Sequence, residues 1–226
     1  MANVKPNNQE GGRYEAFEAK LSKTEQFFKE NQKLIWGIVG AIVIIGACAL
    51  AYSKFIYQPK CAEAQEQAFP AEISFQSSEY ELALNGDGNV PGFAQIIDQY
   101  GAKAGKAVYL YAGICELQLG NFENALSYLK KYNGKDEILA GRAESCKGDA
   151  YVGLGDYDTA VSCFKNAVKV NGDNVLAATY YQKAGLAYEA LGKKAEALDC
   201  YKTIEDRYPQ SVEAYDIAKF IARVSE

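Results

Sequence analysis

The residue types that most often carry chemistry are either missing from this chain or too far apart to act together. The chain contains no histidine, which excludes Ser-His-Asp triads, Cys-His dyads and the His-containing zinc sites of metalloproteases. Its six cysteines lie at least 13 residues apart, as Cys48, Cys61, Cys115, Cys146, Cys163 and Cys200. Since no CxxC pair occurs, thioredoxin-like redox chemistry and zinc ribbons are excluded as well.

The acidic residues do not form a ligand set or a catalytic pair. The stretch 85–89, NGDGN, resembles the start of a calcium-binding loop, but Val90 and Ile96 stand where that loop needs its glycine and its closing glutamate. Asp156 and Asp158 lie among turn residues, where solvated carboxylates are expected. No phosphate-binding loop or dinucleotide fingerprint occurs, so the sequence predicts a protein that is not an enzyme and holds no cofactor or metal.

An apolar run near the N-terminus is the clearest structural feature. Residues 34–53 are consecutive uncharged positions, and a helix of that length spans about 30 Å, the thickness of a hydrocarbon core. Lys33 and Lys54 flank the run, and Trp36 lies near one end as an interface aromatic. We therefore predict a single transmembrane helix over 34–56. A cleaved signal peptide is the alternative, against which the long preceding segment and the bulky residues after the run argue.

The distribution of basic residues predicts the orientation of this span. More lysines and arginines lie in the roughly 20 residues before it than after it: Arg13, Lys20, Lys23, Lys29 and Lys33, against Lys54 and Lys60. The positive-inside rule places residues 1–33 in the cytoplasm and 57–226 across the membrane. Residues 34–226 contain 18 basic and 24 acidic groups, so we expect neither nucleic-acid binding nor attraction to an anionic membrane surface.

The segment before the span has a helical pattern of its own. Four residues recur with the spacing i, i+4, i+7 and i+11, namely Phe17, Leu21, Thr24 and Phe28, and charged residues fill many of the positions between them. Two interpretations are open. The pattern indicates either an amphipathic helix on the membrane surface that positions the span, or a docking helix for a cytoplasmic partner.

Beyond the span, three stretches of the chain repeat one another. Residues 112–132, 147–167 and 184–204 align with spacings of 35 and 37 residues. They share a small residue early in the stretch, a Leu-Gly pair, and an alanine five residues after that glycine: Gly113, Gly148 and Gly185; Leu119–Gly120, Leu154–Gly155 and Leu191–Gly192; Ala125, Ala160 and Ala197. A generic helical bundle gives no reason for such recurrence, whereas stacked helical units do.

This pattern resembles the tetratricopeptide repeat (TPR), a pair of antiparallel helices of about 34 residues. The resemblance implies an all-α fold, in which the single N-terminal transmembrane helix is followed by a TPR-type helical-hairpin solenoid over 57–226. It places clear repeats at about 106–139, 141–174 and 178–211, a leading helix pair at 60–101 and a capping helix at 212–226. The chain departs from the family pattern in two ways. Only the third unit has the closing proline, Pro209, and Lys147 replaces the usual apolar residue before Gly148.

The first helix of each unit is expected to line the inner face, where TPR proteins commonly bind peptides. Leu110 and Ile114 stand where the family's carboxylate-binding Lys and Asn would be, so a carboxylate clamp is not expected. We predict instead that an apolar strip binds a partner protein, and it comprises Leu110, Ile114, Leu117, Val152 and Leu186. The alternative is that residues 60–101 cover this strip. The cysteines of the repeats are interpreted as small buried residues, while Cys61 lies near the membrane.

The plan of the whole chain resembles the YfgM-like proteins, ancillary subunits of the bacterial SecYEG translocon. The likeness includes the segment TEQFFKENQKLIWG, residues 24–37, at the entry to the span. It implies a single-pass protein of the bacterial inner membrane with a periplasmic repeat domain. Its implied partners are SecYEG, a PpiD-like membrane-anchored chaperone and secreted client chains. The alternative is a TPR scaffold that organises another envelope assembly or secretion complex.

Overall fold

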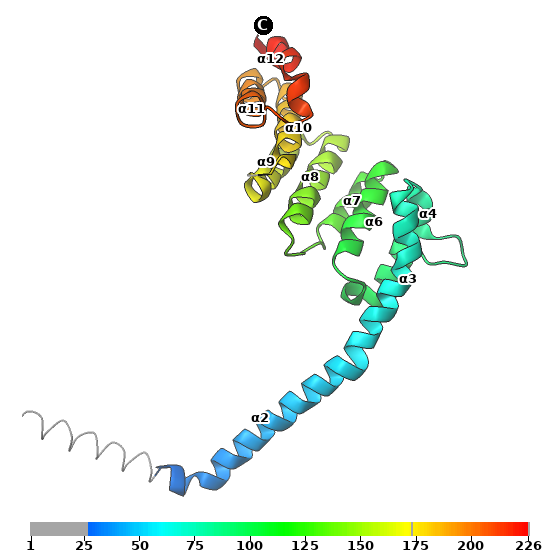
Figure 1. Cartoon of the computed structure of the whole chain (residues 1–226), viewed down its shortest axis with the longest axis vertical. Helices are drawn as coiled ribbons and strands as arrows, with labels where there is room; N and C mark the ends of the chain where they lie inside the picture. The colour runs from blue at the N-terminus through cyan, green and yellow to red at the C-terminus, as the bar shows by residue number, and fades with distance from the viewer. Residues whose placement is uncertain (1–26, 173, 226) are drawn as a thin grey trace, which may run out of the picture. The chain divides into compact units, whose positions relative to one another are not determined.

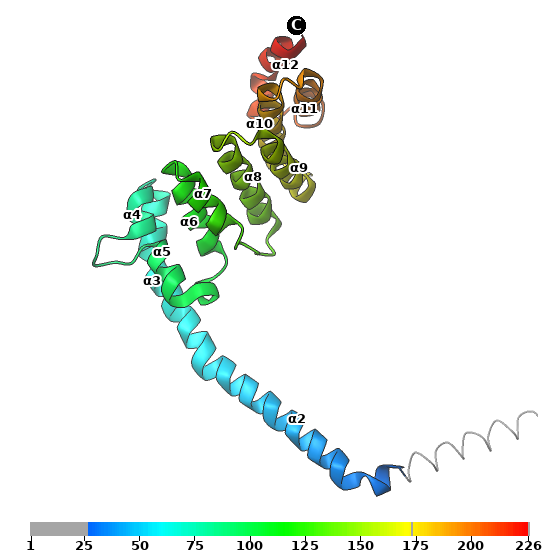
Figure 2. The same ribbon diagram turned by 180° about the vertical axis from the view of Figure 1, so that it is seen from behind.

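The computed structural model describes residues 27–172 and 174–225, and every regular element in these ranges is helical. The predicted all-α fold with TPR-like hairpins is confirmed. The chain divides between Gln58 and Pro59 into an N-terminal unit and a C-terminal unit, and each is described by itself. Figures 1 and 2 show the ribbon from opposite sides.

The N-terminal unit contains α2 (Gln32–Tyr52) and a short π-helix (Ser53–Tyr57). No residue of α2 is buried, and its large apolar side chains are mostly exposed, for example Trp36 at 67% and Leu50 at 73%. This is the one helical stretch of the described residues that is long and apolar enough to cross a membrane, by length and composition. Of the predicted amphipathic pattern, Phe28 is exposed, while Phe17, Leu21 and Thr24 lie outside the described residues.

The C-terminal unit begins with three helices that precede the repeats. They are α3 (Gln58–Gln76), α4 (Tyr80–Asn85) and α5 (Phe93–Tyr100), followed by a 3-10 turn (Gly101–Ala104). Pro70 lies inside α3 without ending it. Three alanines of α3 face a shared core, because their small side chains allow close packing against apolar residues of α4 and α5; the set is Ala64, Ala68 and Ala71 with Leu84, Phe93 and Ile96.

Three helical hairpins follow and stack in chain order (Figure 1). They are α6 (Ala107–Gln118) with α7 (Phe122–Leu129), α8 (Glu137–Gly153) with α9 (Tyr157–Asn171), and α10 (Leu176–Ala190) with α11 (Lys194–Arg207). Each helix packs on its neighbour in the chain, and α9 packs on α10 as strongly as α10 packs on α11. This nearest-neighbour packing is the hallmark of a solenoid.

The recurring residues explain why each unit folds as a hairpin. Gly155 ends α8 with φ +78°, a left-handed conformation that glycine adopts without strain, and Asp156 then caps α9 by accepting the backbone N–H of Thr159 at 3.1 Å. Within the hairpin, a Cβ built on Gly148 would lie 2.4 Å from the ring of Phe164. The recurring small residue therefore lets a large side chain of the second helix approach the first.

A short helix closes the stack. The segment predicted as a capping helix over 212–226 contains a 3-10 turn (Glu213–Tyr215) and then α12 (Ile217–Ser225). Ile217 and Val224 of α12 are buried against the last hairpin. Arg223 adds an ion pair to Glu189 of α10 at 2.6 Å, so α12 covers the apolar end that an open stack would expose.

Candidate partner-binding surfaces

The five residues predicted to form one apolar strip lie in two different environments. Leu110 and Ile114 of α6 are buried, at 0% and 6% exposure, in a core shared with α7 and α8. Leu117 is half-buried, whereas Val152 and Leu186 are exposed at 36% and 43%. The structure therefore does not bring the five together as a continuous exposed surface, because the two α6 residues are used for packing.

The end of α3 contributes to the cover over the α6 residues. A cavity of about 230 Å³ remains between α3, α6 and α8, lined by Glu72, Phe75, Gln76, Leu110, Tyr111, Ile114, Leu139 and Arg142. The ring centroids of Phe75 and Tyr111 lie 5.0 Å apart, and Phe75 also packs against the core that contains Leu110. Burial raises the pKa of Glu72 at the edge of this cavity. At Leu110 and Ile114, the structure therefore agrees with the alternative interpretation, in which residues 60–101 cover the strip.

Between α8 and α10, the first helices carry polar side chains that pair with each other. Lys183 Nζ lies 2.6 Å from Asp149 Oδ2 and 3.3 Å from Ser145 Oγ, and it also lies 6.0 Å from the ring centroid of Phe164. Such a half-buried ion pair links neighbouring units and leaves little free charge for a ligand. The exposed apolar side chains on these helices, Val152 and Leu186, are the parts of the predicted strip still available to a partner.

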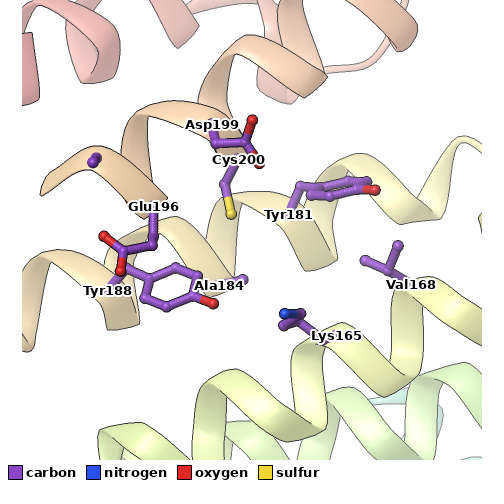
Figure 3. Close-up of a pocket in the computed structure, with 9 residues that line it drawn as sticks. Lys165, Val168, Tyr181, Ala184, Tyr188, Glu196, Asp199 and Cys200 are labelled. Atoms are coloured by element: carbon purple, nitrogen blue, oxygen red, sulfur yellow. The ribbon is translucent and has the colours of Figure 1, made fainter. Parts of the chain in front are cut away.

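A larger cavity lies between the second helices of the last two hairpins. We call it the α9–α11 groove: it has a volume of about 530 Å³, its walls are α9 and α11, and its floor is α10 (Figure 3). The residues that line it are Lys165, Val168, Tyr181, Ala184, Tyr188, Ala195, Glu196, Asp199 and Cys200. Its size lies within the range typical of ligand pockets, about 300–1,000 Å³.

The interior of the α9–α11 groove is uncharged, and its charges lie on the walls. Cys200 Sγ points into the groove (Figure 3), and burial raises the pKa of this thiol to about 11, so it stays protonated and unreactive near neutral pH. Burial also raises the pKa of Tyr181. Lys165, Glu196 and Asp199 supply the charges, and no salt bridge joins any of them to another residue of the described ranges.

Both ends of the groove are tied across the gap. At the N-terminal ends of its walls, Lys193 Nζ lies 2.8 Å from Asp158 Oδ1. At the other ends, the Tyr208 hydroxyl donates a hydrogen bond to the Gly172 carbonyl at 2.5 Å, and the rings of Tyr181 and Tyr208 pack 6.0 Å apart. These contacts bridge α9 and α11 at both ends of the groove.

The equivalent position one unit earlier, between α7 and α9, is filled. In the repeat register, Glu144 and Lys147 of α8 correspond to Tyr181 and Ala184 of α10, and they form an ion pair of 2.7 Å whose side chains are only 26% and 18% exposed. Lys130 adds a cation–π contact with Tyr151, 5.8 Å from its ring centroid. We call this place the α7–α9 groove; long paired side chains occupy it where the α9–α11 groove has a small alanine.

The α9–α11 groove was not predicted from the sequence, although one signal for it was present. Lys147 departs from the family pattern, and Ala184 restores the small residue at the same register position. A comparison of these two positions would have indicated that neighbouring units differ in how far they fill the space between second helices. The strip prediction considered only the first-helix face and so missed this difference.

Of the acidic and cysteine residues that could carry other chemistry, Asp87 lies in a turn, and Cys115 and Cys146 lie in the core. The described residues contain no group of three His, Cys, Asp or Glu side chains placed to hold a metal ion. Asp87 of the NGDGN stretch instead accepts the backbone N–H groups of Asn89 and Val90, at 2.9 and 2.8 Å, and so closes a turn. Cys115 and Cys146 are buried free thiols, and desolvation raises their pKa values to about 12 and 11.

Comparison with known proteins supports the repeat assignment for the last two hairpins. Residues 139–210 match the tetratricopeptide repeat family, whereas no curated protein sequence matches the chain. Two crystal structures of MamA are similar in fold at 16% identity: one has a TM-score of 0.56 and covers 74% of this chain and 82% of that one. The other has a TM-score of 0.53 and covers 69% and 92%. At this identity the likeness shows the fold alone, which is that of TPR-like hairpins.

Proposed function

We propose that this chain is a membrane-anchored protein-interaction module in which α2 is the anchor and the TPR hairpins bind a partner protein. The observation that carries the proposal is the pairing of an apolar helix without a buried residue with a repeat unit that leaves exposed apolar side chains and an open groove. The fold itself suggests protein–protein interaction, because stacked hairpins present extended surfaces to other chains.

The exposure of α2 supports the anchoring role. The described residues leave its apolar side chains uncovered, and burying them is worth about 25 cal/mol per Å², so they are suited to contact with lipid or another chain. We propose that α2 spans the bacterial inner membrane, with residues 1–33 in the cytoplasm and the repeats in the periplasm, because Lys and Arg are more frequent before the span.

At a finer level, we propose that the partner is the Sec translocon. The support is the resemblance of the chain's plan to YfgM-like proteins, so the module would help secreted chains on the periplasmic side together with a PpiD-like chaperone. The second candidate is a scaffold for another envelope assembly or secretion complex, which the same fold allows. We propose that the role is non-catalytic, because the chain contains no histidine and no CxxC pair.

A pull-down separates these two candidates. The tagged full chain would be purified in a mild detergent from cells that express it, and co-purifying proteins would be identified by mass spectrometry. SecY-family subunits should dominate if the module serves the translocon. Their absence, with another envelope complex in their place, would reject the Sec role while keeping the interaction module.

The anchor has its own test. Alkaline carbonate should leave the full chain in the membrane pellet, whereas a chain lacking residues 34–56 should become extractable. Protease added to spheroplasts should degrade the repeat unit. Protection of the repeats, together with cleavage of the N-terminal segment, would reverse the proposed orientation.

A further inference from the structure

We propose that the α9–α11 groove receives one large apolar side chain of a partner's polypeptide segment, with a neighbouring Arg or Lys of that segment bound by Glu196 and Asp199. This inference deepens the proposed function and rests on the chain being a protein-interaction module. It names a surface outside the predicted strip and states the chemistry of its occupant.

The form of the groove requires an apolar anchor of limited size. Val168, Ala184 and Cys200 make its interior apolar, and its volume of about 530 Å³ has room for one large side chain and part of its neighbour. Because the walls are tied at both ends by the Asp158–Lys193 and Gly172–Tyr208 contacts, a continuous helix could not lie along the groove at the level of its floor. A side chain inserted from an extended or turning segment can enter it.

The charges on the walls of the groove determine which residue type should stand next to the inserted apolar side chain in the partner's segment. Glu196 and Asp199 are exposed, lie three residues apart on the same wall, and form no salt bridge with another described residue. The opposite wall contributes one cation, Lys165, so the residues that line the groove include two acidic groups and one basic group. A guanidinium or ammonium group can pair with the carboxylates, and the ring of Tyr188, which lines the same groove beside Glu196 (Figure 3), offers it a cation–π surface.

The repeat itself supplies evidence that the opening is not a general property of the fold. The α7–α9 groove has the same glycine–aromatic contact beneath it, Gly148 with Phe164, as the later groove has in Gly185 with Tyr201. It is nevertheless filled by the Glu144–Lys147 pair. The α9–α11 groove has the equivalent glycine–aromatic contact but carries Tyr181 and Ala184 at those two positions, and these residues leave the space open.

Labelled peptides test the proposal with the full chain in nanodiscs. The probe is a capped hexapeptide, Gly-Ser-Arg-Phe-Gly-Ser, and fluorescence anisotropy measures its binding; matched peptides replace Arg by Glu or Phe by Ser. The Arg-Phe peptide should bind at least about tenfold more tightly than either matched peptide. Equal binding of all three, or no binding of the Arg-Phe peptide, would overturn the proposal.

Two variants assign the binding to the groove. Tyr181→Glu with Ala184→Lys installs the pair that fills the α7–α9 groove, and it should abolish binding. Glu196→Lys with Asp199→Lys changes only exposed positions, so folding should be spared while preference turns to the Glu-Phe peptide. Thr159→Lys with Ser162→Lys, at the equivalent positions of the α7–α9 groove, is the matched control and should bind as the parent chain does.

The variants also distinguish a failure of this inference from a failure of the proposed function on which it rests. Unchanged peptide binding in both groove variants, with circular dichroism spectra like that of the parent, would refute the groove as the site. If those variants still recovered the same partners in the pull-down, the interaction module would stand and only this surface would be rejected. Loss of peptide binding only in the control pair would place the site at the α7–α9 groove and so contradict the proposal.

Discussion

The α7–α9 and α9–α11 grooves occupy equivalent places in successive repeats and yet differ in whether they are open. Both have a buried cysteine on the later wall, Cys163 in one and Cys200 in the other. At two floor positions, however, α8 carries a Glu–Lys ion pair of 2.7 Å, whereas α10 carries Tyr181 and Ala184. A few recurring residues determine how each hairpin packs. The residues at the other positions vary between units, and they determine which groove can hold a ligand.

The largest expected effect tests whether the last two hairpins have the same interhelical packing. Ala160 and Ala197 are both fully buried at the same register position, so replacing either one with leucine should overpack its interhelical contact. We expect each variant to lose about 1–3 kcal/mol of unfolding free energy. Urea denaturation of the full chain in detergent would measure the loss, with Ser162→Ala, at an exposed position of α9, as the control. A large loss in one variant and none in the other would show that the two units are not equivalent.

A smaller change in stability but a new binding property is expected when the filled groove is opened. Glu144→Tyr with Lys147→Ala gives α8 the floor residues of α10 and removes a half-buried ion pair, at a cost within about 1 kcal/mol. The Arg-Phe peptide should then bind at two sites per chain, although the acidic residues of α11 have no counterparts at Thr159 and Ser162; the second site should therefore be the weaker one.

Isothermal titration calorimetry would give the stoichiometry of that variant. A parent chain that binds one peptide and a variant that binds two would sharpen the contrast between the grooves. A folded variant that still binds only one peptide would mean that the two floor residues are not sufficient to open the groove.

The smallest effect concerns a link that only the last unit has. Glu189 of α10 accepts hydrogen bonds from Arg223 of α12 and from the Tyr201 hydroxyl, whereas the residue at its register position in α8 is Val152. Partial burial raises the pKa of Glu189, but these hydrogen bonds outweigh it and leave the pKa below its ordinary value of 4.5. Glu189→Gln should therefore cost a few tenths of a kcal/mol at neutral pH.

The sign of the pH dependence follows from that lowered pKa. The carboxylate binds fewer protons in the folded chain than in the unfolded chain, so its contribution is complete above pH 4.5 and is lost as pH falls through the folded-state value. Thermal unfolding of parent and variant should differ at pH 7 and converge in acid. A difference that grew as the pH fell would contradict this assignment.

Much of the fold could be predicted because it depends on local and recurring residues. The Leu-Gly pairs and the alanines at fixed offsets predicted the hairpins, and the uncharged run 34–53 predicted an apolar helix, which the other described residues leave uncovered. The leading segment was harder to predict, since α3 to α5 pack through alanines and aromatics without a repeat. Helix periodicity could not show that the chain divides there into three helices.

The surface could be predicted only in part. The register assigned Leu110 and Leu186 to one face, but their burial depends on tertiary neighbours: Phe75 of α3 packs against the core around Leu110, while Leu186 stays exposed. Sequence spacing says which face of a helix a residue occupies and does not say what covers that face. The α9–α11 groove depends on the size of two floor residues relative to those of the preceding unit, which periodicity alone does not report.

The most direct test of the interaction module is photo-crosslinking in living cells. A photoreactive amino acid would replace Ala195 at the α9–α11 groove, Leu186 on the first-helix face, or Glu205 on the same helix as Ala195 but outside the groove lining. We predict discrete protein adducts at 195 and 186, none at 205, and loss of the adduct at 195 alone when Tyr181→Glu and Ala184→Lys are added. Absence of adducts at both 195 and 186, or equal adducts at all three positions, would contradict the account.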